Sequence, residues 1–91
     1  MQVFDGKAFM EEKSVEIKLT NGFTTVVAEL TDEQLSKMEE LGKEFENEDG
    51  GVDVARKMVA NLLNTDPDKL KGVGMVELRG VMDFLTERLF G

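Results

Sequence analysis

The side chains that most often carry out catalysis are scarce in this chain. It has no histidine, cysteine or tyrosine, and its only serines are Ser14 and Ser36. Nucleophilic catalysis would therefore depend on a serine, threonine or lysine without the usual imidazole base. Carboxylates are abundant, but the sequence places them on solvated helix faces and in loops rather than around an apolar cleft that would raise their pKa. We expect a protein that is not an enzyme.

The same composition argues against a metal or an organic cofactor. Without cysteine and histidine, the commonest transition-metal ligands are missing. Residues 46–53 are acidic and rich in glycine, but no frame through them supplies the oxygen ligands, the glycine and the final glutamate that a calcium-binding EF-hand loop requires. We expect no metal site, no cofactor site and no catalytic residues.

Charge and hydropathy exclude two further classes of partner. The net charge is −8, and the whole excess of acidic side chains lies in residues 1–50. Binding to nucleic acid through its phosphates needs the opposite sign, so we expect no nucleic-acid partner. No stretch approaches the ~20 apolar residues that span a bilayer, and residues 1–10 do not resemble a signal peptide. We expect an intracellular, soluble protein with no membrane partner.

The strongest structural signal is a β-hairpin in residues 15–29. Asn21 and Gly22 separate two alternating runs, which predicts a two-residue type I′ turn. That turn would pair Val15 with Ala28, and it would place Val26 on the apolar face of the hairpin. Residues 1–14 are predicted to form an irregular or strand-like arm, in which Asp5-Gly6 provides a second turn that could add a third strand.

Three helices are predicted after the hairpin, at residues 31–47, 52–64 and 75–90. The first has a nearly complete start signal, because Thr31 can act as the N-cap and Gln34 as its capping-box partner. The second ends before Pro67, which is expected to open a single helical turn over residues 67–70. Residues 1–91 are therefore predicted to form one α+β domain, with a hairpin followed by three main helices packed on one face.

The last of these helices carries more apolar surface than one sheet face can cover. It is therefore either a central helix packed on two sides or partly a contact surface for another chain. On the second interpretation, an apolar groove between the last two helices binds the partner, although the same side chains could equally be core. The candidate partner-binding residues are Met58, Leu62, Met82, Phe84, Leu85, Leu89 and Phe90.

The order of these elements resembles that of the tail assembly chaperones of long-tailed bacteriophages and prophages. The resemblance rests on the hairpin turn, the Leu-Thr-Asp-Glu-Gln-Leu helix opening, the amphipathic helix at residues 54–63, the Thr-Asp-Pro-Asp-Lys-Leu break and the closing apolar helix. It covers most of residues 15–90. It implies a non-enzymatic protein of the host cytoplasm that binds the tape measure protein and helps to bring tail tube protein to it.

Two other functions compete with this interpretation. One is a structural phage or prophage subunit, such as a head-tail joining protein, that forms a homo-oligomer through its last helix. The other is an acidic inhibitor or nucleic-acid mimic, whose carboxylates imitate a row of phosphates. The carboxylates concerned are Glu39, Glu40, Glu44, Glu46, Glu48 and Asp49.

Overall fold

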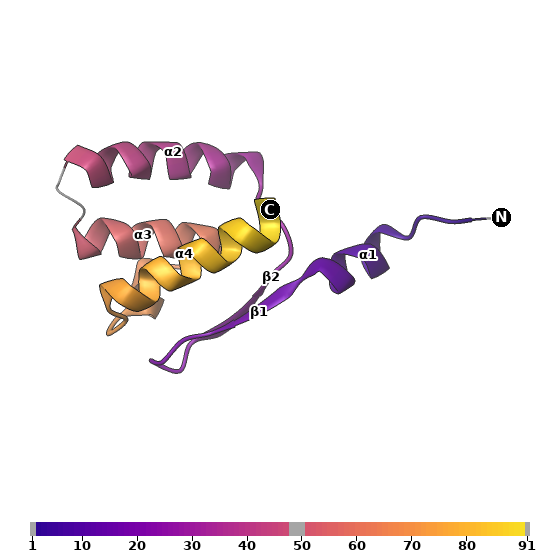
Figure 1. The fold of residues 1–91 in the computed structure, drawn as a ribbon, viewed down its shortest axis with the longest axis horizontal. Helices are drawn as coiled ribbons and strands as arrows, with labels where there is room; N and C mark the ends of the chain where they lie inside the picture. Colours follow the sequence, from indigo (N-terminus) through magenta and orange to yellow (C-terminus); the bar gives the residue numbers. More distant parts are fainter. Residues whose placement is uncertain (1, 48–50, 91) are drawn as a thin grey trace.

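The protein is an α+β domain in which a two-stranded hairpin precedes a layer of helices, as the sequence predicts (Figure 1). The structure is a computed structural model that describes residues 2–47 and 51–90, with the side chains of Leu89 and Phe90 left out. The elements in chain order are α1 (Gly6–Lys13), β1 (Val15–Lys18), β2 (Thr24–Val27), α2 (Asp32–Asn47), α3 (Val52–Leu62), the 3₁₀ helix η1 (Pro67–Leu70) and α4 (Met75–Phe90).

The hairpin forms, but its predicted register is wrong by one residue. Val15 pairs with Val27 rather than with Ala28. The loop has three residues, because the Leu19 N–H donates to the Phe23 carbonyl at 2.9 Å and the Gly22 N–H donates to the Leu19 carbonyl at 3.0 Å. Within the loop only Gly22 has a positive φ, of 95°, so the turn is not type I′. This geometry is a type I turn closed by a glycine bulge.

The shift in register exchanges the two faces of β2. Val27 lies on the same face as Ile17 and is buried with it, whereas Val26 points outward and is 61% exposed. The prediction that Val26 belongs to the apolar face was therefore wrong. A slip of one residue has this effect because side chains alternate between the two faces of a strand.

Residues 2–14 do not form the predicted strand-like arm. From Gly6 to Lys13 the chain is helical, and it does not add a third strand to the sheet. The side chain of Asp5 accepts hydrogen bonds from the N–H groups of Lys7 and Ala8, so Asp5-Gly6 starts a helix instead of closing a turn. In Figure 1, α1 projects away from the body beyond the end of β1.

The body is built around α3, which contacts α2, η1 and α4. Figure 1 shows α2 and α3 running antiparallel, with α4 beside α3 and the hairpin beyond them. Helix α4 packs against α3 and shares the core with the hairpin, while its outer face is open, since Val76 is 88% exposed. The largest fully buried side chains, which mark the core, are Val54, Val59, Leu70, Val73, Leu78 and Leu85.

Candidate functional site

The residues predicted to line a partner-binding groove fall into three groups. Leu62 and Leu85 are 5% and 1% exposed and belong to the hydrophobic core. Met58 and Met82 are half-buried, and Phe84 is 38% exposed. The side chains of Leu89 and Phe90 lie outside the described part of the chain. Because α3 and α4 pack directly on each other, the candidates whose side chains are described do not line one open groove: Leu62 and Leu85 are core, and Met58, Met82 and Phe84 keep part of their surface exposed.

The outer face of α4 is the accessible apolar part of this helix. Val76 is 88% exposed, and Phe84 lies two helical turns further along the same face. Between them is Gly80, where a Cβ atom would meet no described atom within 4 Å. The Arg88 guanidinium lies 5.1 Å from the centre of the Phe84 ring and covers part of it. Sequence reasoning identified Phe84 but treated Val76 only as a member of the wider apolar stripe.

Side-chain hydrogen bonds hold the hairpin loop against the helices. The carboxylate of Glu77, in the first turn of α4, accepts a bond from the Thr20 N–H at 2.8 Å and another from the Thr20 hydroxyl. The Asn21 side-chain amide donates to the carbonyls of Lys69 and Lys71 at 2.9 and 3.1 Å. The hairpin is therefore fixed to both η1 and α4.

These contacts also affect the ionisation of Glu77. The hydroxyl of Thr20, and secondly its backbone N–H, lower the pKa of Glu77 below its usual value, while burial opposes this shift. Both donors favour the charged carboxylate. The hydrogen bonds that anchor the hairpin loop therefore explain the lowered pKa of Glu77. Among the described residues, no second titratable side chain forms a hydrogen bond with Glu77, as a pair of catalytic groups would.

A hollow of about 320 Å³ lies between β1 and α4. Its apolar lining comes from Ile17, Leu19, Val81 and Phe84, and Gly80 leaves it open along the helix. Glu16, Lys18 and Glu77 provide its charged rim, and Glu16 and Lys18 lie 3.5 Å apart as an ion pair. The sequence prediction did not include this hollow.

The N-terminal arm, defined as residues 2–13, is a second exposed apolar feature that the sequence prediction missed. Val3, Phe4 and Phe9 are 81%, 75% and 42% exposed. The rings of Phe4 and Phe9 lie 5.3 Å apart, so the arm carries an aromatic pair, and Lys13 lies 5.8 Å from the centre of the Phe9 ring. None of the residues from Gly6 to Lys13 is buried.

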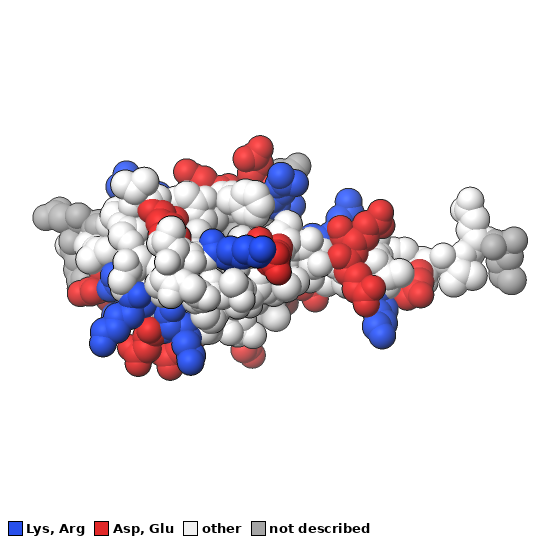
Figure 2. Space-filling view, turned by 90° about the horizontal axis from the view of Figure 1, so that it is seen from below, with Lys and Arg blue, Asp and Glu red and all other residues white. Residues whose placement is uncertain are grey.

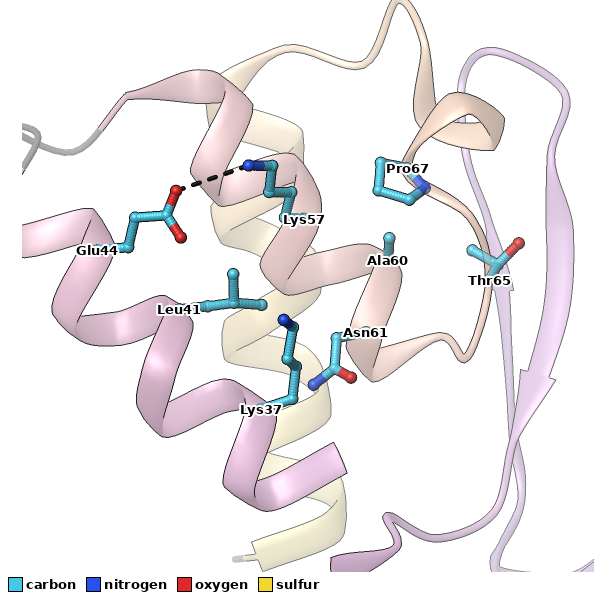
Figure 3. Close-up of a pocket in the computed structure, with 8 residues that line it drawn as sticks. All are labelled: Lys37, Leu41, Glu44, Lys57, Ala60, Asn61, Thr65 and Pro67. Atoms are coloured by element: carbon cyan, nitrogen blue, oxygen red, sulfur yellow. Dashed lines mark ion pairs between the residues drawn. The ribbon is translucent and has the colours of Figure 1, made fainter. Parts of the chain in front are cut away.

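Figure 3 shows another hollow, of about 380 Å³, between α2, α3 and the segment that leads into η1. Two ammonium groups lie beside it, but both are close to carboxylates: Lys57 is 3.6 Å from Glu44, and Lys37 is 3.8 Å from Glu40. Its floor is formed by Leu41 and Ala60. These paired charges make it a poor site for an anionic ligand.

The arrangement of charge bears on the acidic-mimic alternative. Glu40 and Glu44, two of the carboxylates proposed to imitate phosphates, lie beside lysines, which interrupts the row. Glu48 and Asp49 lie outside the described residues. Figure 2 shows acidic and basic side chains interspersed on the face seen from below, with uncharged surface between them. This is the face away from α2, so it does not include the carboxylates that α2 contributes to the proposed row.

Neither the geometry nor the comparisons with known proteins assign a reaction or a family. In the described part of the chain, no three metal-ligating side chains come together. Among the helices of that part, none is long and apolar enough to cross a bilayer. Comparison with protein-family models, with curated proteins and with solved structures finds no match.

Proposed function

We propose that this protein is a non-enzymatic tail assembly chaperone of a long-tailed phage or prophage. In this proposal it acts in the host cytoplasm, binds the tape measure protein and assists assembly of the tail tube protein around it. The observation that carries the proposal is the exposed apolar face of α4, where Val76 is 88% and Phe84 is 38% exposed. Exposed apolar surface of this kind is typical of a contact surface for another polypeptide.

The chemistry of this face suits a helical client. Val76, Gly80 and Phe84 follow each other at intervals of four residues, so they form one line along α4. An amphipathic client helix could lie beside this line, with its backbone close to Gly80 and its apolar side chains on Val76 and Phe84.

The acidity of the chain is consistent with this role. A chaperone that exposes apolar side chains needs charge repulsion to stay dissolved while it is unoccupied, and the net charge of −8 provides it. The same charge disfavours nucleic acid as a competing ligand in the infected cell.

Calorimetric titration with a helical fragment of the tape measure protein tests the proposal. The informative variant is Val76→Glu, because Val76 makes almost no packing contact and a carboxylate is tolerated in the first turn of a helix. The matched control is Val52→Glu, which makes the same change in the first turn of α3, where Val52 is 39% exposed.

The expected result is binding by the unmodified protein and by Val52→Glu, with affinity reduced at least about tenfold in Val76→Glu. A large negative heat-capacity change should accompany binding, because apolar surface is buried. The proposal is wrong if the unmodified protein does not bind the fragment. Equal affinity for Val76→Glu and Val52→Glu would also reject the face of α4 as the binding surface.

A further inference from the structure

The chain exposes more surface than a compact monomer of its mass. Its accessible area is 6500 Å², whereas a folded monomer of 10.2 kDa is expected to expose about 5,300 Å². Its radius of gyration is 14.4 Å, against about 12 Å for a compact chain of this length. The excess of roughly 1,200 Å² exceeds the roughly 800 Å² that each partner buries in a standard interface.

Most of the extension comes from the N-terminal arm. The molecule is 54 Å long but only 28 and 21 Å in its other dimensions, and Figure 1 shows α1 at one end of the long axis. The helix is nevertheless well specified, because Asp5 caps its start and Lys13 lies in its last turn. The arm exposes Phe4 just before the capped helix and Phe9 within it, and this helix buries no residue between Gly6 and Lys13, so the arm is suited to docking elsewhere.

The hollow between β1 and α4 fits such an aromatic arm. It is an open hollow of about 320 Å³, in which a ring would lie over Ile17, Leu19 and Val81 and against the exposed Phe84 side chain. Gly80 opens it on the α4 side, because no described atom lies within 4 Å of the position of a Cβ atom there. Glycine inside a helix is destabilising relative to alanine, and a close approach by another chain would account for its presence at position 80.

The arm cannot reach this hollow in its own molecule with the connection it has. Only Ser14 separates α1 from β1, and its N–H donates to the Met10 carbonyl at 3.0 Å while its hydroxyl donates to the Glu11 carbonyl at 2.7 Å. These bonds direct α1 away from the body, beyond the end of β1 (Figure 1). The hollow is lined by residues 16–19, so the arm would have to reverse direction at Ser14 to enter it.

We propose that the N-terminal arm of one copy docks in the hollow between β1 and α4 of a second copy, and that the exchange is reciprocal. Each chain has one such arm and one such hollow, so two copies related by a two-fold axis satisfy both. Phe4 or Phe9 enters the hollow beside Gly80 and contacts Phe84. The roughly 1,200 Å² that the chain exposes beyond a compact monomer of its mass is enough for each copy's share of such a dimer interface.

Sedimentation velocity over a concentration series tests the exchange. Phe4→Ser/Phe9→Ser removes the aromatic arm and Gly80→Leu fills the hollow, while Lys7→Ser is the control because Lys7 is an exposed residue of α1. Circular dichroism checks that each variant keeps its helices. The unmodified protein and Lys7→Ser should dimerise as concentration rises, and the other two variants should remain monomeric at the same concentrations. Salt should strengthen the dimer, because each copy carries a net charge of −8.

Mixing the two defective variants provides a sharper test. Phe4→Ser/Phe9→Ser keeps its hollow and Gly80→Leu keeps its arm, so a mixture can form one of the two arm contacts, which fluorescence energy transfer between labelled copies would detect. The proposal predicts association in the mixture and none in either variant alone. It is overturned by an unmodified protein that stays monomeric, by variants that dimerise normally, by a mixture that does not associate, or by assemblies larger than the dimer.

The arm and the client would share Gly80 and Phe84, so they compete for that part of α4, and the two proposals are separated by Val76→Glu and by Phe4→Ser/Phe9→Ser. Val76→Glu should retain self-association, because Val76 does not line the hollow. Phe4→Ser/Phe9→Ser should still bind the tape measure fragment. A protein that binds the fragment without forming dimers would refute the arm exchange and leave the proposed function intact, and the reverse result would refute the proposed function alone.

Discussion

Gln34 joins two helices through a single side chain. Its Oε1 accepts a hydrogen bond from the Thr31 N–H at 2.8 Å, while its Nε2 donates to the Asn61 carbonyl at 2.8 Å. The Asn61 amide returns a bond to the Gln34 carbonyl at 2.8 Å. The start of α2 is therefore tied to the last turn of α3, and this contact helps to position the helices that support α4.

Replacing Gln34 by alanine should lower the free energy of unfolding by about 1–2 kcal/mol, because it removes half of the capping box and both hydrogen bonds that the Gln34 side chain makes, to the Thr31 N–H and the Asn61 carbonyl. Urea unfolding followed by circular dichroism measures the change. Ser36→Ala, at an exposed position in the same helix, should stay within about 0.5 kcal/mol of the unmodified protein. Equal effects of the two substitutions would show that Gln34 is not an anchor.

Only half of this arrangement could be predicted from the sequence. Thr31 and Gln34 stand three residues apart at the start of an amphipathic segment, and the capping box that they predict is confirmed, with the Gln34 N–H donating to the Thr31 hydroxyl at 3.1 Å. Asn61 is 27 residues away in sequence. Its role depends on how α2 and α3 pack, which local spacing does not determine.

The anchor at Glu77 should make stability depend on pH. Hydrogen bonds from Thr20 lower the pKa of Glu77 in the folded protein, so the unfolded chain binds more protons near the ordinary glutamate value of about 4.3. The stabilisation that the charged Glu77 carboxylate provides is therefore complete at neutral pH. It is lost as the pH falls from the ordinary glutamate pKa to the lowered pKa of Glu77 in the folded protein.

Thermal unfolding of the unmodified protein and of Glu77→Gln between pH 7 and pH 3 measures this effect. At pH 7 the unmodified protein should melt at a higher temperature than Glu77→Gln. The difference between the two melting temperatures should shrink as the solution is acidified. Glu87→Gln, an exposed position of the same helix, serves as the control. A difference that stays constant over this range would contradict the explanation.

At the level of elements, the hairpin shows why a correct turn signal can give a wrong register. Asn21 and Gly22 do form the turn, but Asn21 does not adopt a positive φ, and its side chain instead accepts from the Phe23 N–H at 3.0 Å and donates to η1. These bonds favour the three-residue loop. The sequence can identify a turn here, whereas the η1 contact that helps to select its type comes from a segment 48 residues away.

Two glycines should respond to alanine in opposite ways. Gly42 lies inside α2, where a Cβ atom would meet no described atom within 4 Å, so Gly42→Ala should stabilise the protein by about 0.5–1 kcal/mol. Gly72 has a φ of 88°, which disfavours any residue with a Cβ, so Gly72→Ala should destabilise it by about 1–2 kcal/mol. Chemical unfolding of both variants tests the assignment, and effects of the same sign would contradict it.

The two faces of α4 should also differ. Leu78 is 0% exposed, so Leu78→Ala should cost about 2–5 kcal/mol through lost contacts and a cavity. Val76→Ala, two residues earlier on the outer face, should change the free energy of unfolding by less than about 0.5 kcal/mol. A large loss of stability in Val76→Ala would mean that the outer face is packed against another part of the chain.

For the whole molecule, the composition predicted an excess of apolar surface but not where it would be exposed. The sequence left Leu62 and Leu85 open to two interpretations, a partner-binding groove or the core, and the packing of α3 on α4 buries both. The exposed surface is instead the line from Val76 to Phe84 and the N-terminal arm. An apolar stripe on a helix shows how much surface needs a partner, but neighbouring elements decide which part of it remains open.

Light scattering by the tape measure protein during refolding from denaturant gives the most direct test of the proposed function. If the outer face of α4 binds apolar segments of this client, the protein should suppress aggregation in proportion to its concentration, and Val76→Glu should do so much less than Val52→Glu. Aggregation that is unchanged by the protein, or suppressed equally by the two variants, would contradict the account.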